Sequence, residues 1–311
     1  MDRGNQTAST DFIILGFSSL PDLRLPLFIM FLTLHLVTLA GNLLIFTLIL
    51  TDARLHTPMY FFLCSLSSVE IFYNLAIVPK MLMGFIVPQN SISFVGCVTQ
   101  MYFFVTLGGA ECFFLTVMAY DRYVAICNPL RYLIVMNRKV CVGLVAGSCI
   151  GGVLLSFVLT TCVFRLPICG SREINHFFCD IPPVLSLTCP DAVAEITLLV
   201  VSSLILMVPV ILILISYVYI VAAILRIRSE AGRRKAFSTC ASHLAVCLLH
   251  YGCAIFIYLR PKSSYSLNHD KLVAVVYTNV TPLLYPMIYT MRNKDVKGAL
   301  IKVLGRKTGR Q

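Results

Sequence analysis

Seven apolar runs separated by short polar segments constrain this chain more than any other feature of its sequence. They cover approximately residues 25–50, 58–80, 97–121, 140–164, 196–225, 236–259 and 272–291. Because a helix needs about 20 apolar residues to cross the hydrocarbon of a bilayer, these runs predict seven transmembrane helices. With 58% hydrophobic and only 13% charged residues, the chain is not an ordinary soluble globule. We therefore expect an all-α membrane protein that forms a seven-transmembrane helix bundle.

The basic residues of the connecting segments predict how the bundle is oriented. Segments 51–57, 121–139, 226–235 and 292–311 lie on one side and carry 17 Lys and Arg residues, against 8 on the other side. The side richer in Lys and Arg is normally cytoplasmic, which places the N-terminus outside the cell. The net charge of +11 then reflects membrane topology, because no compact basic domain is present that would bind nucleic acid.

The two ends of the chain differ in character from the bundle at residues 25–291. Residues 1–24 lack a signal peptide and form an expected extracellular tail, in which Asn5 of Asn5-Gln6-Thr7 is a glycosylation acceptor. The first span then directs the chain to the membrane, and we expect a multi-pass plasma-membrane protein. Residues 292–311 begin with alternating basic and apolar positions, which predicts a short amphipathic helix on the cytoplasmic face.

Four of the 13 cysteines fall on the predicted outer side, where disulfides form. They are Cys97, Cys169, Cys179 and Cys189. Four thiols permit three pairings, which sequence alone does not separate. The simplest geometry joins Cys179 to Cys97 at the start of the third span and leaves Cys169 with Cys189, so that the long loop is folded over the bundle. A metal site at His176 and Cys179 is the less favoured interpretation.

Glu70 and Glu111 lie near the predicted middle of the second and third spans. Inserting an ionised carboxylate there costs at least about 2.5 to 3.5 kcal/mol, so both side chains are expected to face inward, either protonated or sharing a cation. A functional ion or proton site and a purely structural hydrogen bond both remain open. Both interpretations place the two acids together between the second and third helices.

Two helix faces are candidates for a ligand site, although packing alone explains such patterns as well. In the third span, one side carries Phe104, Val105, Gly108, Gly109 and Cys112, and its outer half has no acid. In the sixth span, one inward stripe carries Tyr251, Ala254, Ile255 and Tyr258. A ligand held between them would not need to be a cation.

The triplet Asp121-Arg122-Tyr123 marks the polar end of the third span. A buried Arg paired with an Asp can be released to another partner when neighbouring helices move, which predicts a switch. The alternative is that Arg122 only extends to lipid headgroups. Pro209 in the fifth span and the pair Pro282 and Pro286 in the seventh predict bends in those helices.

Four stretches of the sequence, taken together, resemble the olfactory (odorant) receptors of the rhodopsin-like (class A) G-protein-coupled receptor superfamily. They are Leu55-His56-Thr57-Pro58-Met59-Tyr60, Met118 to Cys127, Lys235 to Leu244 and Pro286 to Asn293. The resemblance covers nearly the whole chain. It implies a receptor, not an enzyme, whose ligand is a small volatile odorant. Consistent with this, the chain contains no HExxH or GxSxG motif.

The resemblance also implies which residues carry the function. The odorant cavity would be lined by Phe104, Val105, Gly108, Gly109, Ser202, Ile205, Tyr251, Ala254, Ile255, Tyr258 and Thr278, with Tyr258, Ser202 or Thr278 as the polar anchor. The switch would comprise Asp121, Arg122, Tyr123, Tyr217 and Tyr289. Outward movement of the sixth helix would then admit the alpha subunit of a stimulatory olfactory heterotrimeric G protein and raise cyclic AMP.

The sequence departs from the family pattern in the core. Tyr285 stands where the family usually has Asn, and Glu70 stands where the superfamily more often has Asp, so a sodium ion at Glu70 and Glu111 is an open expectation. The sixth helix begins with Arg233 and Arg234, which leaves Asp121 as the nearest candidate restraint on Arg122.

Two other functions remain as alternatives. One is a class A receptor for a lipid or peptide. The other is an ion-coupled transporter or channel, in which Glu70 and Glu111 would form an ion path, although the internal repeat typical of transporters is not seen.

Overall fold

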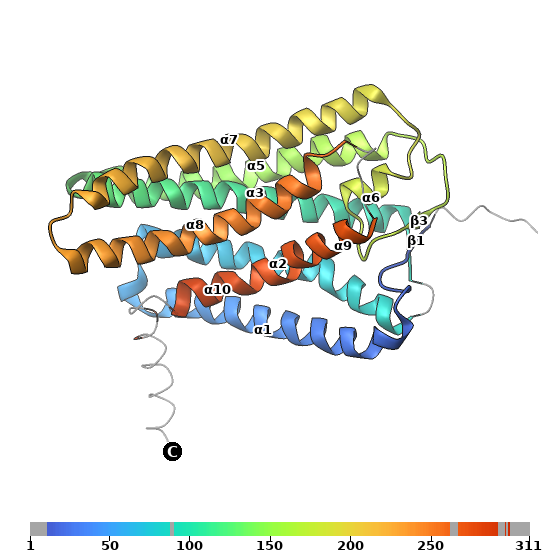
Figure 1. Ribbon diagram of the computed structural model, residues 1–311, viewed down its shortest axis with the longest axis horizontal. Coiled ribbons are helices and arrows are strands. Elements are labelled where there is room, and N and C mark those ends of the chain that lie inside the picture. The colour runs from blue at the N-terminus through green and yellow to red at the C-terminus, as the bar shows by residue number, and fades with distance from the viewer. Residues whose placement is uncertain (1–10, 88–89, 262–266, 292–295, 297, 299–311) are drawn as a thin grey trace, which may run out of the picture.

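The computed structural model describes residues 11–87, 90–261, 267–291, 296 and 298, and within them it contains seven helical stretches long and apolar enough to cross a membrane (Figure 1). This confirms the predicted fold class. The stretches are formed by α1 (Arg24–Thr51), α2 (Pro58–Ile86), α3 (Phe94–Cys127), α5 (Arg138–Phe164), α7 (Ala192–Leu225), α8 (Glu230–Tyr258) and the pair α9 (Leu267–Val275) and α10 (Thr281–Met291). The predicted C-terminal amphipathic helix lies almost wholly outside the described residues.

Several helices extend beyond the apolar runs that predict them. α3 continues to Cys127, so Asp121 and Arg122 lie within the helix and not at its end. α8 begins at Glu230 and therefore includes basic residues that were expected in a loop. Charged side chains near the membrane surface are compatible with helix because the backbone remains hydrogen-bonded within the segment.

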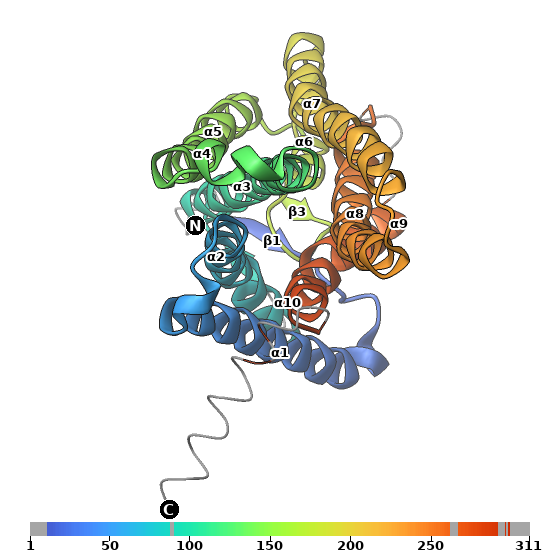
Figure 2. The ribbon, with the colours of Figure 1, turned by 90° about the vertical axis from the view of Figure 1, so that its left-hand side faces the viewer.

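α3 is the central helix of the bundle, enclosed by α2, α5, α7 and α8 when viewed along the helix axes (Figure 2). Glycines permit the close approaches. A Cβ at Gly152 of α5 would clash with the carbonyl oxygen of Thr106 in α3, and a Cβ at Gly41 of α1 would lie 3.0 Å from Cγ of Pro286 in α10. Small residues at such crossings allow helix backbones to approach in a lipid environment.

The seventh span, in which Pro282 and Pro286 predict a bend, changes its helical hydrogen-bonding pattern just before Pro282. A π-helical segment, η5 (Val276–Val280), separates α9 from α10, and Pro282 is the second residue of α10. A proline lacks the N–H that would continue the preceding helical hydrogen bonds, so the hydrogen-bonding pattern changes there.

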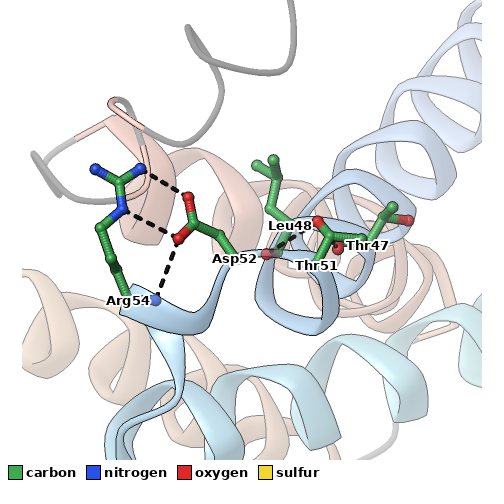
Figure 3. Close-up of polar contacts among 5 residues, drawn as sticks. All are labelled: Thr47, Leu48, Thr51, Asp52 and Arg54. Atoms are coloured by element: carbon green, nitrogen blue, oxygen red, sulfur yellow. Dashed lines mark hydrogen bonds and ion pairs between the residues drawn. The ribbon is translucent and has the colours of Figure 1, made fainter.

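The turns on the side predicted to be cytoplasmic are short and capped. After α1, the one-turn helix η2 (Ala53–Leu55) is fixed by Asp52, which accepts hydrogen bonds from the backbone N–H and the guanidinium of Arg54 (Figure 3). The hydroxyl of Thr51 donates to the carbonyl oxygen of Thr47 at 2.8 Å. A second inner connection contains η3 (Pro129–Arg131) and α4 (Tyr132–Val135).

The outer end is covered by a small sheet and a folded loop, at the end of the bundle that carries β1, β3 and α6 in Figure 1. β1 (Phe12–Ile14) lies between β2 (Ser91–Ile92) and β3 (Glu173–Ile174), antiparallel to the first and parallel to the second. No pattern in the sequence predicts these short strands. They join the N-terminal segment to two loops at the same end of the bundle.

The disulfide pairs are those favoured from the sequence. Cys97 pairs with Cys179 and Cys169 with Cys189, with Cα separations of 5.5 and 5.0 Å. The short helix α6 (Ile181–Leu185) begins two residues after Cys179, so the first disulfide ties the segment leading into α6 to α3.

Candidate ligand-binding site and switch

A cavity lies between the outer halves of α3, α5, α7 and α8, beneath α6. It contains about 490 Å³ of atom-free space, counting its opening. Its walls are formed by Phe104, Val105, Gly108, Gly109, Cys112, Leu155, Leu159, Ile181, Ser202, Ile205, Leu206, Ala254, Tyr258 and Tyr277. Apolar walls with few polar groups are typical of sites for small organic molecules.

Eight of the eleven residues expected to line a cavity do line this one, and three do not. The hydroxyl of Tyr251 donates to the carbonyl oxygen of Cys112 at 2.6 Å, which ties its ring to α3. The hydroxyl of Thr278 donates to the carbonyl oxygen of Ala274 at 2.7 Å and is therefore already occupied. Ile255 packs, partly buried, against the core instead of lining the cavity.

The cavity also has lining residues outside the set of eleven, and of these only Cys112 lies on a helix face that the sequence already marks as a candidate ligand site. Cys112 and Leu206 lie one turn beyond Gly108 and Ser202 on the same helix faces, so the helical repeat was a usable signal. Leu155 and Leu159 of α5 and Ile181 of α6 had no comparable signal, because their inclusion depends on how α5 and the loop pack against α3.

The polar contact at the top of the cavity joins α8 to the loop. Tyr258 donates its hydroxyl hydrogen to the carboxylate of Asp180, with oxygen distances of 3.0 and 3.1 Å. Asp180 also accepts a hydrogen bond from the backbone N–H of Ile181 at 2.7 Å, and only 1% of Asp180 is exposed. Burial raises the pKa of Asp180 to about 7, although these two hydrogen bonds oppose the shift.

Two further polar side chains lie on the wall, Tyr277 of η5 and Ser202 of α7, and Ser202 is the one expected to anchor a ligand. It is buried, and among the residues that the structure describes its hydroxyl has no side-chain hydrogen-bond partner. Of the three expected anchors, Thr278 bonds to the backbone and Tyr258 donates to Asp180. Ser202 is therefore the anchor whose donor and acceptor are both available to a ligand.

His176 in the same loop is a buried aromatic residue rather than an evident metal ligand. Its ring stacks on Phe177 with 4.4 Å between the ring centroids. Burial, followed by the positive charge of Lys271, lowers the pKa of His176 to about 3. Its neighbour Cys179 is in a disulfide. Within the described part of the chain no group of three or more His, Cys, Asp or Glu side chains is arranged to hold a metal ion.

Below the cavity, the two intramembrane acids face the bundle interior, as their cost in lipid requires. Glu70 and Glu111 are 0% and 2% exposed and are close enough to interact electrostatically. Glu111 Oε2 lies 3.8 Å from Nδ1 of His250, and that nitrogen lies 2.9 Å from the hydroxyl of Tyr285. Tyr285, the departure from the family pattern, thus belongs to the polar cluster that contains Glu111.

Three carboxylate oxygens of this pair have no hydrogen-bond partner within the described residues. They are both oxygens of Glu70 and Oε1 of Glu111. Carboxylate oxygens are the preferred ligands of hard cations, and unpaired buried carboxylates are costly. These unpaired oxygens fit the expected sodium ion, which Glu70 and Glu111 would hold.

The switch residues lie at the other end of α3, and Asp121 is not ion-paired with Arg122. Asp121 accepts a hydrogen bond from the hydroxyl of Tyr132 in α4 at 2.8 Å, and no ion pair between Asp121 and Arg122 occurs among the described residues. The expectation that Asp121 restrains Arg122 directly is therefore not met in this conformation. Burial raises the pKa of Tyr132, and the nearby carboxylate adds to the shift.

Arg122 instead faces α8. It is 5% exposed, its Nε has no partner, and it lies next to Cys240 and His243 of α8. Tyr217 of α7 donates its hydroxyl to the carbonyl oxygen of Cys240 at 3.1 Å, and its oxygen lies 2.8 Å from Nδ1 of His243. Tyr123 stacks beside Tyr120. The side chain of Tyr289 and the whole of Asn5 lie outside the described residues.

Comparison with known proteins gives a family for this arrangement. The family model of olfactory receptors matches residues 31–307. Olfactory receptor 10J1 of Homo sapiens is 52% identical over 308 residues, which cover 99% of this chain and 96% of that protein. Olfactory receptor 10J5 of Mus musculus is 52% identical over 309 residues, covering 99% and 100% of the two chains.

A third relative, olfactory receptor 10K2 of Homo sapiens, is 50% identical over 307 residues, which cover 98% of this chain and 98% of that protein. These matches span the seven helices, the outer loop and the switch. The chain belongs to the olfactory receptor family, whose members are signalling receptors and not enzymes.

Proposed function

We propose that the protein binds small volatile molecules in the cavity beneath α6 and, when they are bound, activates a stimulatory olfactory G protein that raises cyclic AMP. The observation that supports this most directly is a mainly apolar cavity whose few polar points are Ser202, Tyr277 and the Tyr258–Asp180 contact. Such a site favours a mostly apolar ligand with one hydrogen-bonding group.

The coupling between ligand and G protein is proposed to run through α8. Its outer end contacts the cavity at Tyr258, and its inner end covers Arg122 near Cys240. A ligand that binds better when α8 has moved outward shifts the equilibrium by its difference in affinity for the two states. We further propose that the N-terminus is extracellular and the C-terminus cytoplasmic, at the plasma membrane.

The sodium ion is part of the proposal because the unpaired oxygens of Glu70 and Glu111 fit it. A bound cation would offset the charge of the buried carboxylates. If sodium is bound in this way, the thermal stability of the purified protein is expected to fall when sodium is replaced by choline. The dependence on sodium would be lost in Glu70→Gln. A melting temperature independent of sodium in the wild type would show that the acids are protonated instead.

The test of the function is a cyclic AMP assay in cells that express the full chain, screened against a chemically diverse panel of odorants. At least one small, mainly apolar odorant is expected to raise cyclic AMP, and Ser202→Ala is expected to reduce that response while surface expression is retained. Ion or solute flux through the purified protein, without any response of a heterotrimeric G protein to any odorant, would contradict the proposal.

A further inference from the structure

In the bundle, α2 is flanked by α1 and α5 (Figure 2). A second large hollow is lined by residues of these three helices and of α4 and opens on the side of the bundle. We call it the flank groove. Counting the open space at its mouth, it contains about 1780 Å³ of atom-free space, compared with about 490 Å³, counted in the same way, for the cavity beneath α6. Its walls are mainly apolar side chains that include Phe46, Leu50, Phe61, Leu133 and Val142. Four of these five are exposed on the protein surface: Leu50, Phe61, Leu133 and Val142.

The length of the flank groove matches one leaflet of a bilayer. Along α2 it extends from Pro58, at the helix start, to Ser68. Ten residues of α-helix rise about 15 Å, which is half of a hydrocarbon core of about 30 Å. The groove therefore opens at one membrane surface and ends near the bilayer middle, which is the depth reached by an acyl chain of a single leaflet.

The mouth of the flank groove is positively charged. Arg138 is the first residue of α5; it is exposed, and within the described chain it has no hydrogen-bond or ion-pair partner. The side chains that line the groove include no Asp or Glu, and the first turn of α5 carries no acid. Arg54 precedes the groove residue Leu55 in the sequence, but its guanidinium forms an ion pair with Asp52 (Figure 3). Arg138 and the N-terminus of α5 thus attract an anion from the lipid surface.

We propose that the flank groove binds one anionic phospholipid, with its phosphate at Arg138 and an acyl chain lying along Phe61 between α1 and α5. The proposal uses the orientation given under the proposed function, because the groove then opens to the cytoplasmic leaflet, where anionic lipids are concentrated. The bound lipid also contacts Leu133 in α4, the element from which Tyr132 holds Asp121.

The absence of tryptophan from the sequence makes this proposal directly measurable. Phe61→Trp introduces the single tryptophan of the full chain on the groove wall, and the variant is placed in nanodiscs for selective excitation of that residue. The measurement compares quenching by phosphatidylserine and by phosphatidylcholine, each brominated on its acyl chains. We expect several-fold stronger quenching by the anionic lipid, and we expect Arg138→Gln to bring the ratio of the two close to one.

Tyr219→Trp is the matched control, because Tyr219 is 57% exposed in the inner part of α7, outside the flank groove. It should show no preference for either lipid. If Phe61→Trp does not fold, Val142→Trp reports from the opposite wall. Equal quenching at both positions, or a preference unchanged by Arg138→Gln, would overturn the proposal, and so would displacement by water-soluble glycerophosphoserine. None of these results depends on an odorant or a G protein.

Discussion

Tyr258 at the outer end of α8 donates its hydroxyl hydrogen to the carboxylate of Asp180, which lies in the loop fixed to α3 by the Cys97–Cys179 disulfide. The helix proposed to move on activation is therefore hydrogen-bonded to a covalently anchored lid. Because Tyr258 also lines the cavity, a ligand that contacts this ring acts on the contact between helix and lid.

Removing this contact should loosen the outer end of α8. A hydrogen bond to a charged group contributes about 1.5 to 3 kcal/mol, so Tyr258→Phe is expected to lower the melting temperature of the purified receptor. It should also change the ranking of agonists more than the basal cyclic AMP level. Tyr219→Phe, which alters an exposed phenol on α7, is the control. An unchanged melting temperature would mean that the contact is not stabilising.

The raised pKa of Asp180 predicts a specific pH dependence of stability. Between the ordinary pKa of 3.8 and the folded value of about 7, the folded protein binds more protons at Asp180 than the unfolded chain does. The contribution of Asp180 to stability therefore falls as pH rises through this window, and it is constant above it. We expect Asp180→Asn to gain melting temperature relative to the wild type as pH is raised from 5 to 8.

His176 contributes the opposite slope in part of the same range, which is why the comparison with a variant is needed. Its folded pKa of about 3 is below the ordinary 6.5, so its contribution to stability is lost as pH falls below 6.5. His176 is unchanged in Asp180→Asn and its effect cancels in the difference. A difference that is independent of pH would contradict the assigned pKa of Asp180.

Ser202→Ala tests the polar anchor. Since the hydroxyl is buried on the cavity wall without a side-chain partner, a ligand that bonds to it loses about 0.5 to 1.5 kcal/mol in the variant. This corresponds to an EC50 increase of roughly 2- to 10-fold for agonists with a hydrogen-bonding group. Agonists without such a group should be unaffected, and equal losses for both classes would indicate a role in folding.

Arg122→Ala should abolish odorant-evoked cyclic AMP while leaving surface expression largely intact. The reason is that Arg122 lies buried against α8 at Cys240, where outward movement of α8 would release it. Tyr132→Phe is the companion variant, because it removes the hydrogen bond to Asp121 and leaves Arg122 in place. It is expected to raise basal signalling. Normal odorant responses in Arg122→Ala would remove the switch from the mechanism.

Gly152→Ala tests the closest approach of α3 and α5. The added Cβ would meet the carbonyl oxygen of Thr106, a backbone atom that cannot rotate away, and overpacking of this kind costs about 1 to 3 kcal/mol. Reduced surface expression is expected. Gly147→Ala is the matched control on the same helix, because a Cβ there meets nothing within 4 Å. Equal expression of the two variants would show that α5 can shift.

The sequence by itself determined the seven spans, because their apolar length against the thickness of a bilayer leaves little choice of structure. It also placed Glu70 and Glu111 in the interior, since an ionised carboxylate facing lipid is too costly. Helical repeats along α3 identified Phe104, Val105, Gly108 and Gly109 as one wall, which the structure brings to a common cavity.

Only the tertiary structure decided which helix faces meet and where the polar groups find partners. Leu155, Leu159 and Ile181 enter the cavity because Gly152 lets α5 approach α3 and because the Cys97–Cys179 disulfide holds α6. Asp121 bonds to Tyr132 and Tyr258 to Asp180 through contacts between separate segments. Periodicity describes one helix at a time, so it carries no information about such pairs.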